Sequence, residues 1–530
     1  MRSLLICIIT AAAWCLPYTV VLAQSTATTY GNSIQAEDMK SLIYALASDS
    51  FQGRETGEEG QRRAADFIAA QMKAEGLPTV GDRNTYFQNI VLEKSNWNDL
   101  SVKVDGKAFT QREDFYVYPH LIQSVPPVQL KEVVFVGYGI EDPAYNDYAD
   151  AEVAGKAVIF YDSEPLDASG KSLLTHKLSR SVWSLQWEKK VALAKQKGAA
   201  MVFIIDPALQ ENARKNRKQL NSFGWRAAES NVGGKMANML NTIFVSPALA
   251  QAILDNKWKK IQDALADIAN GRPPRAIKVK TKTEVALDKE TTTLKGSNVV
   301  GLIEGTDSLL RDEYVFVTAH YDHLGHIDDR IYYGADDNAS GTAGVIEIMR
   351  AFALAKKQGK GPKRSVVCML VSGEEKGLLG SKYYVEFPIF PLQQTVADIN
   401  IDMIGRTDAP HTDGKYIYVI GSDRLSSELH TLQEKANSDY THLSLDYKYN
   451  DPKDPNHYYE RSDHYNFAEQ GIPSVFYFNG THDDYHQVTD TPDKINFEAA
   501  ALRAQLAFYT AWEIANRPER LKVDKKTKKK

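Results

Sequence analysis

The sequence predicts an α/β fold: a mixed, mostly parallel, doubly wound sheet with helices on both faces, and a smaller β-rich unit inserted into it. Two observations lead to this prediction. From residue 277 onward, short apolar runs alternate with helical segments, which is the rhythm of βαβ units. Between residues 125 and 275, short strand-like runs surround a single helix. We therefore expect one large α/β domain that a second domain interrupts.

Apolar and β-branched runs predict the strands of the large domain. They lie at Val299–Ile303, Tyr314–Thr318, Val366–Val371, Val396–Ile401, Tyr416–Ile420 and Ser474–Phe478. Residues 277–283 alternate apolar or threonine side chains with lysines, a pattern typical of a half-buried edge strand. A helix is expected near 340–357, and helical spacing within 36–76 predicts two more around a loop at 48–54.

The inserted unit is predicted from strands at 133–136, 157–160 and 201–205 and a helix at 187–197. Its exit is marked by Gly271-Arg272-Pro273-Pro274, because glycine and proline end regular structure. The expected organisation is a signal peptide at 1–23, an amino-terminal part of the large domain at 24–124, the insert at 125–275, the main part of the large domain at 276–522 and a basic disordered tail at 523–530.

Composition and charge exclude several classes of protein. The chain has 530 residues, of which 43% are hydrophobic and 25% charged, so it has ordinary globular composition rather than that of a disordered or collagen-like protein. Its formal net charge is −5, so no overall basic field is present to hold nucleic acid. The lysine-rich end at 525–530 is interpreted as a solvated tail.

The first residues have the pattern of a secretory signal. A basic Met1-Arg2 precedes an apolar run from Leu4 to Val21, and Val21-Leu22-Ala23 supplies small residues for cleavage after Ala23. The alternative is a transmembrane anchor, but Pro17 interrupts the run and a polar stretch follows. We expect export to the periplasm or the outside of the cell, with no stable insertion in a membrane.

The cysteines fit an exported chain without disulfides. Cys7 and Cys15 leave with the signal, so only Cys368 remains in the mature chain. Cys368 lies inside an apolar run and is expected to pack in the core rather than act as a nucleophile. The core, or a bound metal, must therefore supply the stability of the mature protein.

Polar clusters follow several of the predicted strands, where a doubly wound sheet places its ligands. They contain His320 and Asp322, Asp336 and Asp337, Glu374 and Glu375, Asp402, and Tyr485 and His486. Histidine and carboxylate ligands without thiolate suit zinc, although cobalt or manganese can substitute. A catalytic zinc with an open coordination position takes three protein ligands. A set of five such ligands exceeds that number and fits two ions that share a carboxylate.

The sequence resembles the M28 family of zinc peptidases. The matching strings are His320-Tyr321-Asp322-His323-Leu324-Gly325, Gly334-Ala335-Asp336-Asp337-Asn338-Ala339-Ser340-Gly341, Gly373-Glu374-Glu375-Lys376-Gly377, Asn400-Ile401-Asp402-Met403-Ile404-Gly405, and Asp484-Tyr485-His486 with Asp490-Thr491-Pro492-Asp493-Lys494. The segment 48–54 is similar to the family's usual opening, and the unit at 125–275 resembles a protease-associated (PA) domain.

The resemblance implies a role for each site residue. His320 and Asp402 would hold one zinc, Glu375 and His486 would hold the other, and Asp337 would bridge them. Glu374 would be the general base, Asp322 would orient His320, and Tyr485 would contact the substrate carbonyl. Asp336 is left with a supporting or capping role.

The expected activity is that of a secreted dizinc aminopeptidase, in which two zinc ions activate a water that attacks peptides with a free amino terminus. A carboxypeptidase or dipeptidase of the same family is the first alternative, and it would need a basic group such as Arg406 for the terminal carboxylate. The second alternative is a non-catalytic protein that uses the PA unit to bind a partner.

Overall fold

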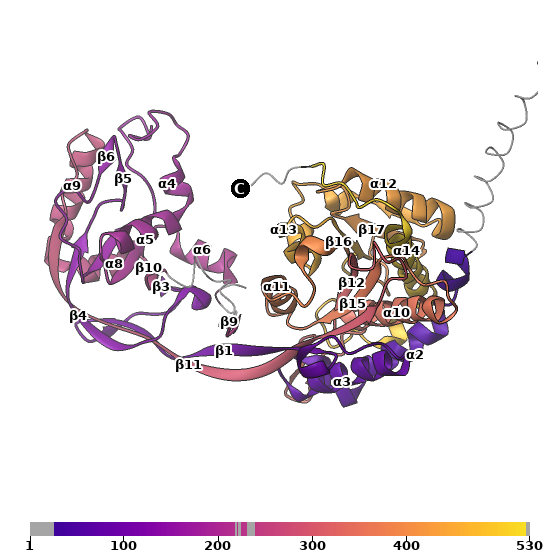
Figure 1. Ribbon diagram of the computed structural model, residues 1–530. Helices are drawn as coiled ribbons and strands as arrows, with labels where there is room; N and C mark the ends of the chain where they lie inside the picture. Colours follow the sequence, from indigo (N-terminus) through magenta and orange to yellow (C-terminus); the bar gives the residue numbers. More distant parts are fainter. Residues whose placement is uncertain (1–25, 218–219, 221–223, 230–238, 526–530) are drawn as a thin grey trace, which may run out of the picture. The chain divides into compact units, whose positions relative to one another are not determined.

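The computed structural model describes residues 26–217, 220, 224–229 and 239–525 (Figure 1). The predicted signal peptide at 1–23 and the last five residues of the predicted tail therefore lie outside the described residues. Within the described residues, no helix combines the length and the apolar character that a bilayer crossing requires.

The chain forms two compact units. The first comprises the chain up to Leu92, the short segment Ala227–Glu229 and the chain from Leu294 onward. The second comprises Glu93–Arg226 and Ser230–Thr293. This unit is wider than the insert predicted at 125–275. The boundaries at Glu93 and Thr293 fall inside two long strands rather than in loops.

These two strands are β1 (Phe87–Val104) and β11 (Ile277–Ile303), which pair with each other. The sequence predicted two separate strands at 277–283 and 299–303, but both belong to the continuous 27-residue β11. Within 277–283, Ile277 and Val279 pair with Phe135 and Val133 of β4 (Val125–Phe135). The alternation of buried residues with exposed lysines was correctly anticipated.

The first unit contains a mixed, mostly parallel sheet, as predicted. Its strand order is β18-β17-β19-β16-β12-β15-β11. The bounds are Ser444–Asp446 for β18, Tyr416–Ile420 for β17, Ser474–Phe478 for β19, Thr395–Ile401 for β16, Tyr314–His320 for β12 and Ser365–Val371 for β15. β12 runs parallel to β15 and β16, and β16 runs parallel to β19. β17 is antiparallel to β19, and β15 is antiparallel to β11.

Helices cover both faces of this sheet (Figure 1). One face is covered by α2 (Ala36–Leu46), α3 (Glu59–Ala74), α10 (Gly341–Lys357) and α14 (Phe497–Asn516). The other carries α11 (Leu379–Glu386) and α13 (His464–Glu469). Helix α12 (Ser427–Ala436) packs against α14.

Alternation along β12 explains why both faces are covered. Val315 and Val317 face the cluster that contains α10 and α14, whereas Phe316 contacts Tyr384 and Phe467 on the opposite face. Because successive side chains of a strand point to opposite faces, a strand that is apolar throughout must be buried on both. The doubly wound architecture is therefore confirmed.

The second unit also has helices on both faces of its sheet. Its strand order runs from β11 through β4, β7 (Ala157–Tyr161), β8 (Met201–Ile205) and β10 (Thr242–Val245) to β3 (Phe115–Tyr116). The pairs β4–β7, β7–β8 and β8–β10 are parallel. The sequence predicted one helix here, α5 (Trp187–Gln196), but α4 (Val182–Leu185), α6 (Leu209–Lys215), α8 (Pro247–Leu254) and α9 (Trp258–Ala269) are present as well. The unit is thus more helical than expected.

Candidate metal centre

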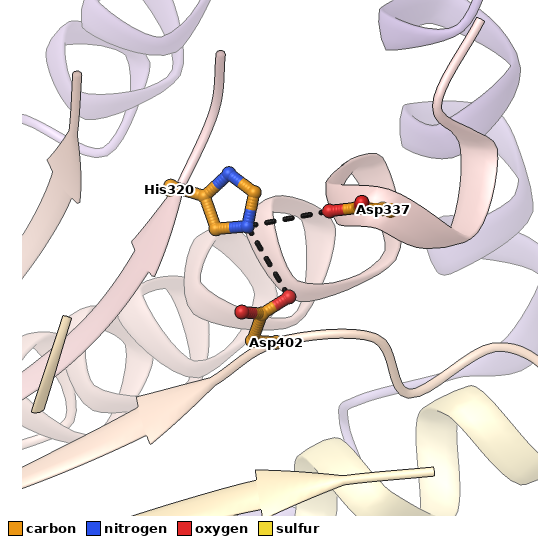
Figure 2. A group of neighbouring side chains, drawn as sticks. All are labelled: His320, Asp337 and Asp402. Atoms are coloured by element: carbon orange, nitrogen blue, oxygen red, sulfur yellow. Dashed lines mark hydrogen bonds and ion pairs between the residues drawn. The ribbon is translucent and has the colours of Figure 1, made fainter. Parts of the chain in front are cut away.

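The first candidate ion position lies at the carboxyl ends of β12 and β16 in the first unit. His320 is the last residue of β12, and Asp402 directly follows β16. The His320 Nε2 atom lies 3.2 Å from Asp402 Oδ1 and 3.4 Å from Asp337 Oδ1 (Figure 2). All three side chains are buried. Because adjacent parallel strands end at one edge of the sheet, residues 82 positions apart in sequence meet here.

A second group meets on the other side of Asp337. The His486 Nε2 atom lies 3.0 Å from Asp337 Oδ2 and 3.3 Å from Glu375 Oε1. Glu375 comes from the turn after β15, and His486 comes from the loop after β19. Burial alone would lower the pKa of His486, but its contacts with Asp337 and Glu375 raise that pKa to about 10.

The two groups share Asp337, whose two carboxylate oxygens face different histidines. The structure thus brings together all five residues that the sequence analysis proposed as ligands. Burying several ionised carboxylates side by side is costly unless cations compensate their charge. Imidazole nitrogens and carboxylate oxygens are ligands that suit zinc. The residues present therefore fit two metal ions, one on each side of Asp337.

The loop that carries Asp337 is fixed by buried hydrogen bonds. Gly334 precedes it with a φ of +54°, and a Cβ atom there would lie 2.2 Å from the Asp337 carbonyl oxygen, so glycine is needed. The Asp490 carboxylate accepts hydrogen bonds from the backbone N–H groups of Asp336 and Asp337 at 3.1 Å. Asn338 donates to the Ile401 carbonyl at 3.0 Å, which ties this loop to β16.

Asp336 has the supporting role that was expected from the sequence. Its Oδ1 atom accepts hydrogen bonds from the Gly405 N–H at 2.6 Å and the Ser340 hydroxyl at 3.0 Å. Its Oδ2 atom lies 3.1 Å from His482 Nε2. Asp336 therefore joins the Asp337 loop to the segments after β16 and β19, and it points away from the candidate ion positions.

Asp322 lies behind His320, but its carboxylate is not the nearest partner of that ring. The His320 Nδ1 atom is 3.2 Å from the Asp322 carbonyl oxygen and 3.9 Å from its carboxylate. The carboxylate accepts hydrogen bonds from the Thr56 hydroxyl at 2.7 Å and the Glu374 N–H at 3.2 Å. Asp322 therefore orients His320 through its backbone and positions Glu374 through its side chain.

Glu374, the candidate base, lines a cavity together with Asp337 and Asp402. Burial raises the pKa of Glu374 well above its ordinary value, and the neighbouring carboxylates of Glu375 and Asp402 act in the same direction. Since the adjacent Glu375 contacts His486, the two glutamates point to different partners.

Tyr485 lines the same cavity. Its ring stacks on the His486 ring with the centroids 3.9 Å apart, and its hydroxyl oxygen accepts a hydrogen bond from Arg461 Nη2 at 3.3 Å. The loop that carries Tyr485 is held by Asp484, which pairs with Arg406 at 2.9 Å and with Lys494 at 2.7 Å. Arg406 is therefore engaged with a loop carboxylate.

His323 is a site residue to which the sequence analysis gave no role. It is fully buried, and its Nδ1 atom lies 2.9 Å from Glu375 Oε1 and 3.8 Å from Asp337 Oδ2. With Asp337 and Glu375 it forms a second three-residue group able to hold an ion. In the sequence, His323 lies three residues after His320. This spacing alone does not indicate that its side chain contacts Glu375.

Arg54 is the other residue whose role was missed. It is fully buried and donates hydrogen bonds to the carbonyl oxygens of Leu46, Tyr321, Tyr333 and Gly334 at 2.7–2.9 Å. The His323 N–H in turn donates to the Arg54 carbonyl at 3.1 Å. The amino-terminal segment at 53–56 therefore braces both the His320 segment and the loop before Asp337.

Fold and site together define an α/β protein with a candidate two-ion centre of histidine and carboxylate ligands. Comparison with known proteins identifies a related family. Residues 298–511 match the sequence profile of Peptidase family M28, and this range contains every proposed ligand. The match spans less than half of the chain, and over this range the chain is similar to the peptidases of family M28.

Two relatives and one solved structure illustrate the similarity. Aminopeptidase NAALADL1 of Mus musculus is 36% identical over 136 residues, which cover 25% of this chain and 16% of the relative. Aminopeptidase YwaD of Bacillus subtilis (strain 168) is 26% identical over 255 residues, 46% of this chain and 50% of the relative. The chain thus aligns with half or less of these relatives.

The solved aminopeptidase from Aneurinibacillus sp. strain AM-1 superimposes with a TM-score of 0.52 at 19% identity. The alignment covers 94% of this chain and 98% of that chain. At this level of identity the similarity concerns the fold, which both proteins share over most of their length.

Proposed function

We propose that this protein is a dizinc aminopeptidase that removes amino-terminal residues from peptides. The observation that carries the proposal is the position of Asp337, whose two oxygens face His320 at 3.4 Å and His486 at 3.0 Å. Asp402 completes one group and Glu375 the other. A carboxylate shared in this way is the arrangement of two-metal hydrolytic sites. The match of residues 298–511 to family M28 and the names of the relatives support the same activity.

Zinc bound at these positions would lower the pKa of a water molecule and polarise a carbonyl oxygen. The side chains of the cavity would carry out the remaining steps. Glu374 takes a proton from the water that attacks the peptide carbonyl and delivers it to the leaving amine. Tyr485 donates its hydroxyl proton in a hydrogen bond to the carbonyl oxygen, where negative charge develops. Both side chains line the cavity that contains Asp337 and Asp402.

Hydrolysis of aminoacyl-anilides tests the activity directly. The zinc-loaded protein is expected to hydrolyse anilides with a free α-amine and to lose that activity when the amine is acetylated. Equal hydrolysis of the acetylated substrates would reject an aminopeptidase. Two zinc ions per chain by metal analysis are expected, and absence of metal after purification with zinc would favour the non-catalytic alternative.

We also propose that the chain is exported and cleaved after Ala23, and that the second unit is a PA-type insertion. The support for export is the sequence pattern of the first 23 residues, which lie outside the described part of the structure. Amino-terminal sequencing of the mature protein is expected to begin at Gln24. A chain that retains the apolar segment and sediments with membranes would instead indicate an anchor.

A further inference from the structure

Arg461 is a charged residue of the cavity that the steps above do not use. It lines the cavity together with Glu374 and Tyr485 and is exposed at its mouth. Its guanidinium lies over the Tyr458 ring, 4.7 Å from the centroid, and Nη2 donates to the Tyr485 hydroxyl at 3.3 Å. Among the described residues, no carboxylate forms an ion pair with Arg461.

The surroundings of Arg461 leave most of its hydrogen-bonding capacity free. A guanidinium has five N–H donors in a planar fork, and the structure uses one of them on an uncharged hydroxyl. Arg406 pairs with Asp484 at 2.9 Å and does not line the cavity. Arg461 is therefore the arginine of this cavity that is able to accept a new carboxylate partner.

The rest of the cavity wall is apolar on the side next to Arg461. Met403, Tyr458, Phe476 and Phe478 line it, and each of these four side chains is buried in the protein. Their contacts with each other fix the wall, since the Tyr458 and Phe478 rings lie 5.1 Å apart. A group that enters the cavity on this side thus meets an apolar surface and the Arg461 guanidinium, whereas the carboxylates of Asp337, Glu374 and Asp402 line the rest of the cavity.

From these contacts we propose that Arg461 selects substrates that carry a carboxylate near the scissile bond. The proposal rests on the proposed peptidase function. The carboxylate has two possible sources, the side chain of an acidic amino-terminal residue and the terminal carboxylate of a dipeptide. A planar guanidinium binds either one through paired hydrogen bonds. The apolar wall holds the aliphatic part of the same substrate.

Matched substrates test this selection on the zinc-loaded full chain. One pair is the anilides of glutamate and glutamine, which share their shape and differ in charge. The other pair is leucylglycine and leucylglycinamide, which differ at the carboxyl terminus. We expect the wild type to favour the charged member of one pair by about tenfold or more in kcat/KM, and Arg461→Met to bring that ratio close to one. The pair that responds identifies the source of the carboxylate.

Arg424→Met provides a matched control. Arg424 also lies over a tyrosine ring, 4.7 Å from the Tyr459 centroid, but it does not line the cavity. This variant is expected to keep the wild-type ratio. If Arg461 only positioned Tyr485, its substitution would lower hydrolysis of both members of each pair equally, and the ratio would not change. That result, or wild-type ratios near one in both pairs, overturns the proposal.

Binding measurements separate this inference from the proposed function. If the zinc-loaded wild type hydrolyses none of these substrates, the proposed function fails, and calorimetric titration with the same pairs then tests Arg461 alone. Tighter binding of the charged member, lost in Arg461→Met, supports carboxylate selection. Equal affinity for both members in the wild type rejects it, whether or not the protein is a peptidase.

Discussion

Replacing Arg54 with methionine tests whether the amino-terminal segment maintains the candidate metal centre. Methionine keeps the apolar stem of the side chain but removes every donor. The four carbonyl oxygens of Leu46, Tyr321, Tyr333 and Gly334 then lose a buried partner. At about 1–3 kcal/mol for each buried acceptor left without a partner, the first unit is expected to lose at least about 4 kcal/mol of stability.

The effect on metal binding follows from where these carbonyls lie. Tyr333 and Gly334 immediately precede the loop of Asp337, and Tyr321 directly follows His320. Supporting groups around metal ligands typically change affinity by about 10- to 100-fold, and we expect a loss in this range for zinc. Thermal unfolding with a chelator measures the stability of the metal-free protein, and competition with a chromophoric chelator measures zinc affinity.

Arg364→Met is the matched control. Arg364 is also fully buried and donates to the carbonyl oxygens of Ile514, Arg517 and Pro518, but none of these residues belongs to the site. It should lower stability by a similar amount and leave the intrinsic zinc affinity unchanged. The reasoning is refuted if Arg54→Met lowers stability while its zinc affinity equals that of the Arg364→Met protein.

Three further predictions concern the site itself. Glu374→Gln should retain two zinc ions and lower kcat by about 10²- to 10⁴-fold, and a variant that keeps more than a tenth of the wild-type rate would exclude Glu374 as the base. Tyr485→Phe should lower kcat by about tenfold or more with little change in KM, because its hydroxyl acts where charge develops; a change in KM alone would assign it to substrate binding. His486→Ala should reduce the zinc content of the purified chain from two ions to one, and retention of both ions would point to His323 as the ligand.

The local sequence pattern predicted most strands of the sheet in the first unit. Apolar runs placed β12, β15, β16, β17 and β19 within a residue or two, because strands buried on both faces are apolar throughout. The pattern did not reveal that β11 is one continuous strand. Its middle, from about 288 to 296, is polar and partly exposed, and its strand conformation depends on pairing with β1 rather than on an apolar face.

The site was predictable where its residues follow strands, and less so where they act across long sequence distances. His320 and Asp402 were found because both stand at strand ends. Arg54 was not given a role, because its partners at 321, 333 and 334 are more than 260 residues away. Arg461, which lines the cavity from the short loop before α13, was not given a role either. No local pattern distinguishes a buried brace or a cavity arginine from an ordinary surface charge.

Anomalous diffraction at the zinc edge, from crystals of the zinc-loaded protein, tests the central claim most directly. A two-ion centre predicts two peaks on opposite sides of Asp337, one bound by His320 and Asp402 and the other by Glu375 and His486. A single peak, or two peaks that do not both contact the Asp337 carboxylate, would contradict it.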